Sequence, residues 1–307
     1  MKNASANRAR AEQPLAAPPL LITGRTGTLG QAFRTLCHLR GLDAVCLDRA
    51  ELDISDAAAI AAALRRYQPW AVVNTAGYVR VDEAETDAAR CYQANTTGPA
   101  LLARACAAQA LLLLTFSSDL VFDGAQTRAY LETDHAYPLN VYGHSKLLAE
   151  QTVLASHPRA RVVRTSAFFS AWDTPNFVHH ALAAVRNGQL FAAADDVAIT
   201  PTYVPDLVNT ALDLLLDGEH GIWHLTNEGT YTWAELARLA VGTAGLDRAG
   251  IVPRPVASFG WAAPRPRHSA LRSQQGLLLP SVESGLHRYL ADEHLLQSAA
   301  PSAVLLP

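Results

Sequence analysis

A tyrosine and a lysine four residues apart, Tyr142 and Lys146, are the residues of this sequence best suited to proton transfer. Pro138 and Asn140 precede them and favour the start of a helix, so both side chains would lie on one helix face. An ammonium group beside a phenol stabilises the phenolate and should lower the tyrosine pKa from its ordinary value of about 10. The pair therefore predicts a general acid for the reduction of a carbonyl group.

A serine and an aspartate, Ser118 and Asp119, follow an apolar run at 111–116 that has the length and composition of a buried strand. In open parallel sheets, ligands bind outside the carboxyl ends of the strands. We therefore expect both side chains to lie at that edge of the sheet.

Three glycines, Gly24, Gly27 and Gly30, follow the apolar run 20–23 and precede an amphipathic segment at 31–39. This order predicts a strand, a tight turn and a helix. Gly24 permits the turn, Gly27 lets the backbone approach a diphosphate, and Gly30 lets the helix pack closely on the strand. Since the N-terminus of a helix attracts phosphate, the segment predicts a dinucleotide site.

An acidic residue, Asp48, ends a second predicted strand at 43–47. It stands about 20 residues after the glycines, where a dinucleotide fold places the acid that holds the adenosine ribose. Arg25 and Arg49 offer guanidinium groups that could hold a 2′-phosphate instead, so the cofactor stays open between NADH and NADPH. In the next loop, Asp53 and Ile54 could contact the adenine.

A third predicted strand, 70–74, leads into small residues, so a flat ring or a diphosphate could come close near Gly77. Farther along, Asn95 is expected to cap a helix and to do no more. Helices are also expected at 57–66, with Asp56 as the N-cap, and in three later segments. Those segments are 176–187, 233–244 and 282–296.

The alternation of strands and helices predicts an α/β fold: a Rossmann-like, doubly wound parallel sheet with a smaller C-terminal substrate-binding lobe. We expect flexible tails at both ends of the chain. The predicted boundaries are 1–17 for the N-terminal tail, 18–168 for an NAD(P)-binding domain completed by 199–224, 169–198 and 225–298 for the lobe, and 299–307 for the C-terminal tail.

Composition limits the class of protein. The 307 residues carry a net charge of −3 with scattered Lys and Arg, so we expect no nucleic-acid partner. No apolar run approaches the roughly 20 residues of a membrane span, and the N-terminus lacks signal-peptide character, so we expect no membrane partner. The four cysteines have no metal-ligand spacing and suit core thiols in a reducing cytoplasm. They are Cys37, Cys46, Cys91 and Cys106.

Motifs from both halves of the chain resemble one family. The glycine turn at 23–30, Ser-Ser-Asp-Leu-Val-Phe-Asp-Gly at 117–124 and Asn-Val-Tyr-Gly-His-Ser-Lys at 140–146 resemble the extended short-chain dehydrogenase/reductases, and within them the dTDP-4-dehydrorhamnose reductase family. Pro-Thr-Tyr-Val-Pro-Asp at 201–206 extends the resemblance into the second half. The resemblance implies an NADPH- or NADH-dependent oxidoreductase that reduces the 4-keto group of a nucleotide-activated deoxysugar.

The resemblance also implies roles for single residues. Ser118 would hydrogen-bond the substrate carbonyl, Tyr142 would donate the proton, and Lys146 would lower the tyrosine pKa while it holds the nicotinamide ribose. The implied cofactor-binding residues are Gly24, Gly27, Thr28, Leu29 and Gly30 at the diphosphate, Asp48 at the ribose, Asp53 and Ile54 at the adenine, and Gly77 and Tyr78 at the nicotinamide side. The implied substrate-binding residues are Val79, Ser118, Asp119, Asn176 and Arg265.

Departures from the family pattern fall in the sugar subsite. Leu120 stands where the family usually has Tyr, Ala167 where it usually has Trp, and Val79 where it often has Thr. The sugar is therefore open, and two other functions stay alternatives: a non-catalytic dinucleotide-binding regulatory subunit and a nucleotide-sugar epimerase. The resemblance also implies a homodimer.

Overall fold

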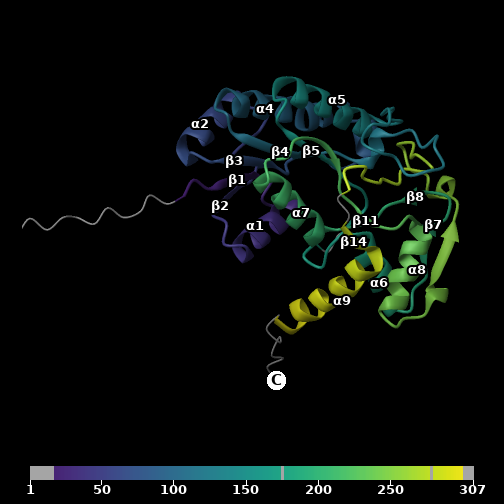
Figure 1. The fold of residues 1–307 in the computed structure, drawn as a ribbon. Helices are drawn as coiled ribbons and strands as arrows, with labels where there is room; N and C mark the ends of the chain where they lie inside the picture. Colours follow the sequence, from purple (N-terminus) through teal and green to yellow (C-terminus); the bar gives the residue numbers. More distant parts are fainter. Residues whose placement is uncertain (1–16, 174–175, 277–278, 300–307) are drawn as a thin grey trace, which may run out of the picture.

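A six-stranded parallel sheet forms the centre of the molecule (Figure 1). The computed structural model describes residues 17–173, 176–276 and 279–299. The predicted tails at 1–17 and 299–307 lie outside the described residues, apart from residues 17 and 299. The strand order is β10-β5-β4-β3-β1-β2. The strands are β1 Leu20–Thr23, β2 Ala44–Leu47, β3 Ala71–Asn74, β4 Leu112–Phe116, β5 Arg161–Arg164 and β10 Gly221–His224.

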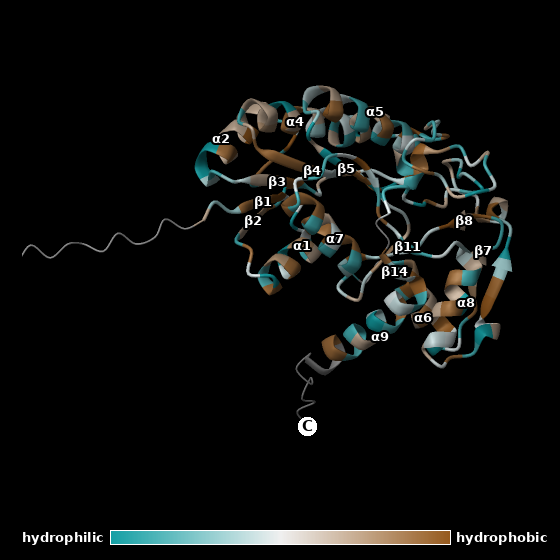
Figure 2. Ribbon diagram, in the orientation of Figure 1, coloured by the Kyte–Doolittle hydropathy of each residue, from teal (hydrophilic) through white to brown (hydrophobic). Residues whose placement is uncertain are grey.

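Helices cover both faces of this sheet, which confirms the predicted doubly wound α/β class (Figure 1). On one face lie α1, Thr28–Leu39, and α7, Val204–Leu216; on the other lie α2, Ala57–Tyr67, α4, Gly98–Ala108, and α5, Val141–Ser156. Neighbouring strand residues supply the two faces alternately: Ile22 packs towards α1 and α7, whereas Leu21 packs towards α2 and α4. The apolar strands stand out in brown in Figure 2.

Side-chain caps fix where the helices begin. Asp56 caps α2 through the backbone N–H groups of Ala58 and Ala59, and Asn140 caps α5 by accepting from the Gly143 N–H at 2.7 Å. Both residues were predicted at these positions. The predicted role of Asn95 was wrong: it lies inside a π-helical turn, Gln93–Thr97, between α3, Ala88–Tyr92, and α4.

A smaller lobe packs around its own core at one end of the sheet. Three helices enclose that core: α6, Phe177–Arg186, α8, Trp233–Thr243, and α9, Val282–Ala299. They agree with the predicted segments within three residues at each end. The strands β7, Phe191–Ala194, and β13, Ile251–Arg254, pair in parallel beside α8 (Figure 1).

Short strands and 3-10 turns lie between the longer elements of the sheet domain and the smaller lobe. Paired strands are β6 Phe168–Phe169 with β9 Thr202–Tyr203, β8 Ala198–Ile199 with β12 Tyr231–Thr232, and β11 Asn227–Glu228 with β14 Leu279–Ser281. The 3-10 turns are Glu83–Glu85, Asp119–Val121, Arg248–Gly250 and Val256–Phe259. The chain thus leaves the sheet after β5, builds part of the smaller lobe, and returns to add β10 beside β5.

Within the described residues, no helix is long and apolar enough to cross a membrane. All four cysteines are free thiols, and Cys37, Cys91 and Cys106 are buried. No group of three or more His, Cys, Asp or Glu side chains in the described ranges is arranged to hold a metal ion.

Candidate active site

The glycine turn has the backbone that its sequence predicts. Gly24 has φ of +76°, and a Cβ there would stand 2.8 Å from the backbone nitrogen of Ala76. A Cβ on Gly30 would stand 2.1 Å from the carbonyl oxygen of Gly24, so α1 packs directly on the turn. The turn therefore brings the N-terminus of α1 to the carboxyl ends of β1 and β3.

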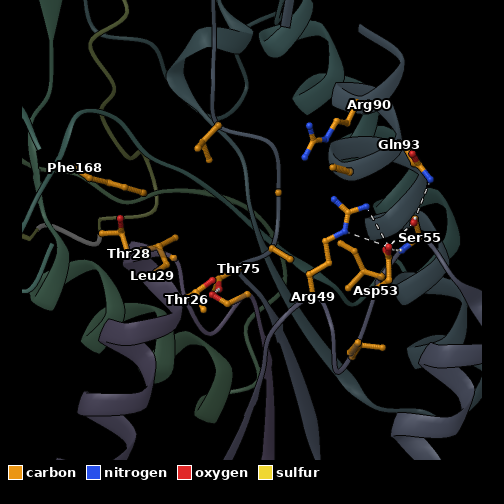
Figure 3. Close-up of a pocket in the computed structure, with 18 residues that line it drawn as sticks. Thr26, Thr28, Leu29, Arg49, Asp53, Ser55, Thr75, Arg90, Gln93 and Phe168 are labelled. Atoms are coloured by element: carbon orange, nitrogen blue, oxygen red, sulfur yellow. Dashed lines mark hydrogen bonds and ion pairs between the residues drawn. The ribbon is translucent and has the colours of Figure 1, made fainter. Parts of the chain in front are cut away.

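A cavity of about 420 Å³ lies in front of this turn. Figure 3 shows Phe168 at one end and Arg49 with Arg90 at the other. Most of the predicted cofactor residues line the cavity: Gly24, Gly27, Thr28, Leu29, Arg49, Asp53, Ile54 and Gly77. Val79, which was predicted for the substrate, lines this cavity as well. Arg25, Gly30, Asp48 and Tyr78 are not among its lining residues.

The acid that follows β2 is already paired. Asp48 forms an ion pair with Arg25 and accepts hydrogen bonds from the backbone N–H groups of Ala50 and Glu51. Hydrogen bonding to the Glu51 N–H, assisted by Arg25, holds the pKa of the Asp48 carboxyl below its ordinary value. The carboxylate is therefore ionised, and the Arg25 charge beside it offsets its charge.

A second pair lies at the end of the cavity away from Phe168. Arg49 donates to Asp53 at 3.2 Å, and Asp53 accepts from the hydroxyl of Ser55 at 2.7 Å (Figure 3). The Ser55 hydrogen bonds lower the pKa of Asp53, so its carboxylate is charged. Arg90 comes from α3 and lines the same end, so two guanidinium groups face this part of the cavity.

A second cavity, of about 520 Å³, contains the predicted proton donor. It lies between the sheet edge and the smaller lobe, and its wall carries Ser118, Asp119, Tyr142 and Arg265. The two cavities adjoin, because Ala167 lines the second and its neighbour Phe168 lines the first. Ser118, from the end of β4, and Tyr142, from the first turn of α5, thus face one space.

Tyr142 is held in its protonated form. Burial raises the pKa of its phenol, and the neighbouring Asp119 carboxylate raises it further, against a hydrogen bond with Ser118 that lowers it. The prediction that Lys146 lowers the tyrosine pKa is wrong for this structure. The Lys146 ammonium nitrogen lies 5.8 Å from the ring centroid of Tyr142 and donates to the carbonyl oxygen of Phe116 instead. A neutral phenol nevertheless suits a proton donor.

Lys146 lies next to the strand end that carries Gly77. Burial lowers the pKa of its ammonium group to about 8. A Cβ on Gly77 would stand 3.5 Å from the lysine nitrogen and 2.9 Å from Oδ1 of Asn95, so only a glycine leaves this approach open. Gly77 thus lines the first cavity with the lysine close behind it.

Asn95 has a larger part in the site than its sequence suggested. Its side-chain oxygen accepts from the Tyr78 N–H at 2.7 Å, and its amide donates to the Tyr78 carbonyl at 3.0 Å and to the Ser145 hydroxyl at 3.0 Å. It therefore fixes the loop after β3 to α5, one residue from Lys146. Asn95 stands in the polar run Gln93–Thr97, so its sequence context could not have singled it out.

Two predicted substrate residues make contacts within the protein. Arg265 pairs with Asp82 at 2.6 Å and lies over the ring of Trp261, at 4.9 Å from its centroid. Its hydrogen bond is the main cause that lowers the pKa of Asp82. Asn176 is outside both cavities and caps α6, accepting from the His179 N–H at 3.0 Å.

Aromatic side chains form the outer wall of the second cavity. Phe177 meets Trp233 edge to face at a centroid distance of 4.7 Å, and Phe259 stacks with Trp261 at 5.2 Å. Sequence reasoning missed this wall, because its members come from three separate segments of the smaller lobe with no common spacing. Flat apolar groups would fit against it, whereas the inner end at Tyr142 is more polar.

Similarity to known proteins agrees with this geometry. The RmlD substrate binding domain family matches residues 19–293. The chain is 38% identical over 264 residues to dTDP-4-dehydrorhamnose reductase of Mycobacterium tuberculosis, with 84% of this chain and 86% of that one covered. It is 32% identical over 253 residues to dTDP-4-keto-6-deoxy-D-glucose reductase of Streptomyces niveus, with 82% and 87% covered.

A solved structure has the same fold over nearly its whole length. It is dTDP-4-dehydrorhamnose reductase from Bacillus anthracis str. Ames in complex with NADP, with a TM-score of 0.85 at 28% identity. The match covers 90% of this chain and 99% of that one.

Proposed function

The chain belongs to the RmlD substrate binding domain family, and from this premise we propose that it is an NAD(P)H-dependent reductase of the 4-keto group of a nucleotide-activated 6-deoxysugar. The observation that carries the proposal is the shared cavity of Ser118 and Tyr142, which adjoins a glycine-turn cavity. The cavity with Tyr142 supplies a protonated phenol, and the cavity at the glycine turn has the residues of a dinucleotide site.

The first cavity fits a dinucleotide. The N-terminus of α1 faces it, and Gly27 leaves space in which a Cβ would meet only the Gly24 carbonyl oxygen, at 3.5 Å. Gly27, Thr28 and Leu29 would hold the diphosphate, while Asp53 and Ile54 would lie at the adenine. When bound, the reduced nicotinamide supplies the hydride.

The residues at the sheet edge manage the proton. The Tyr142 phenol is protonated and would give its proton to the keto oxygen as that oxygen gains negative charge. The Ser118 hydroxyl, in the same cavity, would hydrogen-bond that oxygen and hold the carbonyl in place. Lys146 would hold the nicotinamide ribose from behind Gly77.

The substrate would span the second cavity. We propose that the base of a nucleoside diphosphate lies against the wall of Phe177, Trp233, Phe259 and Trp261, with the sugar at Tyr142. Two relatives are named dTDP-4-dehydrorhamnose reductase (Mycobacterium tuberculosis) and dTDP-4-keto-6-deoxy-D-glucose reductase (Streptomyces niveus). These names support a dTDP-linked 4-keto-6-deoxyhexose as the substrate. Leu120 and Ala167 line the sugar end and offer neither hydrogen bonds nor stacking there.

A direct assay tests the proposal. Purified protein with NADPH or NADH and a panel of dTDP-4-keto-6-deoxyhexoses should consume the reduced cofactor, followed by its absorbance, and yield the 4-hydroxy sugar. Tight cofactor binding with no turnover of any sugar would instead favour the regulatory subunit. Interconversion of sugars without net consumption of cofactor would favour the epimerase.

Three further proposals concern the domain boundaries, the location in the cell and the oligomeric state. We propose a sheet domain of residues 18–168 completed by 199–224, with 169–198 and 225–298 forming the lobe. The four free thiols support a cytoplasmic location. Family resemblance supports a homodimer, which sedimentation would test.

A further inference from the structure

Asp82, in the segment that follows β3, holds a loop of the smaller lobe. Its carboxylate pairs with both ends of the Arg265 guanidinium: Oδ1 accepts from Nη1 at 2.8 Å and Oδ2 accepts from Nη2 at 2.6 Å. Oδ1 also accepts from the Ala263 N–H at 3.0 Å, and Nη1 of Arg265 donates to the Ala263 carbonyl oxygen at 2.6 Å. Four hydrogen bonds therefore fix the three residues to one another.

The same guanidinium supports an aromatic ring of the second cavity. Cζ of Arg265 lies 4.9 Å from the ring centroid of Trp261, which stacks in turn with Phe259. Trp261 is 41% exposed, so its position depends on these two neighbours more than on burial in a core. Arg265, Trp261 and Phe259 line the cavity, whereas Asp82 is not among its lining residues. The carboxylate thus holds this part of the wall from outside.

One edge of the Arg265 guanidinium is left for a ligand. A guanidinium carries five N–H donors. Within the described residues, both donors of Nη1 and one donor of Nη2 are used, which leaves the Nε–H and the second N–H of Nη2. These two groups lie parallel on one edge, a geometry that matches two oxygens of a phosphate. Since Arg265 lines the cavity, this edge suits an anionic group bound there.

We propose that Asp82 is a positioning residue for the nucleotide-sugar substrate, which holds Arg265 so that its remaining edge binds the diphosphate and its face supports Trp261 beside the base. This role rests on the proposed reductase function. Asp82 would act through Arg265 and would not touch the substrate. Its segment borders both cavities, because Val79 lines the first and Val81 lines the second.

Positioning and charge have opposite effects on the binding of a diphosphate. Without the Asp82 charge, Arg265 would keep its full positive charge, which by itself strengthens the binding of an anion. The Asp82 side chain is 39% exposed, however, so solvent screens this effect. An unpaired Arg265 would become mobile, and the ligand would have to order it again. We therefore expect weaker binding, by about tenfold, the upper range of the cost of ordering one long side chain.

The test measures the Kd of dTDP and of UDP by calorimetry in the presence of NADP⁺, for the wild type and Asp82→Asn. The Asn side chain has the same size but offers one acceptor oxygen in place of two. Weaker binding in the variant, of whichever nucleotide binds the wild type, supports the proposal. Equal or tighter binding, or no binding of either nucleotide to the wild type, would overturn it. Arg265→Lys, which keeps the charge without the planar fork, should weaken binding by a similar factor, and wild-type affinity there would also overturn it.

A double-mutant cycle shows whether Asp82 acts through Arg265. Arg265→Met removes the guanidinium, so Asp82→Asn should not change the Kd further in that background. Additive effects of the two changes would overturn the proposal. Glu83→Gln is the charge-matched control, because Glu83 is exposed and pairs with Arg80 at 2.9 Å. Its Kd should equal that of the wild type; a loss equal to that of Asp82→Asn would assign the effect to net charge and overturn the proposal.

Kinetics separate positioning from a general loosening of the site. Tyr142 on α5 and Ser118 after β4 are held by other contacts, so Asp82→Asn should raise KM for the keto sugar while kcat and the Kd of NADPH stay unchanged. A fall in kcat as large as the rise in KM would overturn the proposal. If the wild type reduced no keto sugar, the proposed function would fail, yet the nucleotide binding cycle would still decide the role of Asp82.

Discussion

The ammonium nitrogen of Lys146 lies 3.1 Å from the carbonyl oxygen of Phe116, the last residue of β4. The contact ties α5, which carries Tyr142, to the strand that leads directly to Ser118. The proton donor and its neighbouring hydroxyl therefore keep a fixed separation even without a bound ligand. A helix and a strand that meet in this way pre-organise the site before the substrate enters.

The position of Lys146 predicts how stability depends on pH. Burial lowers its pKa from 10.5 to about 8. Between these pH values the unfolded chain holds the proton and the folded chain does not, so the free energy of unfolding should rise with pH across this window. Urea unfolding should show a smaller rise in Lys146→Met than in the wild type, whereas Arg104→Met, an exposed position on α4, should match the wild type. If the free energy of unfolding rose equally with pH in all three proteins, that result would contradict the lowered pKa of Lys146.

Replacing the proton donor should stop turnover without loss of cofactor. Tyr142→Phe keeps the ring and removes the phenolic proton, so kcat should fall by a factor on the order of 10²–10⁴. NADPH binding, measured by fluorescence titration, should be unchanged. Tyr137→Phe, at a side chain that is 65% exposed, is the matched control and should retain full activity. Normal turnover in Tyr142→Phe would rule out the assigned acid.

Two glycines of the turn should respond differently to alanine. Gly27 has φ of −82°, and an added Cβ would meet only the Gly24 carbonyl oxygen, at 3.5 Å. Gly27→Ala should therefore fold normally but lose NADPH affinity, because its methyl group occupies the cavity. Gly30→Ala would place a Cβ 2.1 Å from the same oxygen and should lower the unfolding free energy by about 1–3 kcal/mol. Urea unfolding with calorimetric NADPH binding separates the two effects.

The Arg25 pair should influence the choice of cofactor. Arg25→Ala would leave the Asp48 carboxylate without its ion-pair partner. An unpaired carboxylate favours ribose hydroxyls and repels a 2′-phosphate. The ratio of kcat/KM for NADPH to that for NADH should fall about tenfold, the value of one charged hydrogen bond. Arg34→Ala, on the exposed side of α1, serves as the control. An unchanged ratio would place Arg25 outside cofactor selection.

A left-handed alanine lies at the junction of the two cavities. Ala167 has φ of +43°, which costs about 1–2 kcal/mol for a residue with a Cβ. Ala167→Gly should therefore fold with equal or greater stability, by up to about 1 kcal/mol. Ala105→Gly, in the middle of α4, should do the opposite and destabilise by about 1 kcal/mol. Unfolding in urea measures both, and a destabilised Ala167→Gly would contradict the backbone assignment.

The sheet was predictable because its signals are local. Apolar runs such as 20–23 and 111–116 are bounded by turn residues, and caps such as Asp56 stand where the helices begin. The glycine turn, Ser118 and Tyr142 were predictable for the same reason. Parallel strands must meet at one edge, and both cavities lie there.

The contacts between side chains were not predictable. The pKa of Tyr142 depends on burial and on Asp119, and the pairing of Arg265 with Asp82 joins residues far apart in the sequence. The spacing of Tyr142 and Lys146 predicts that they share a helix face. It does not predict that the lysine turns towards Phe116, because that depends on how the helix is placed on the sheet.

The late arrival of β10 has a consequence for synthesis of the protein. β5 pairs with β4 as soon as both have left the ribosome, but its other side gains a partner only after residues 165–220 have been made. Until then β5, which is buried throughout the finished fold, is the outer strand of the sheet and can pair with other chains; afterwards the more exposed β10 takes that place. We therefore expect the unfinished sheet to pair with other chains more readily than the finished one.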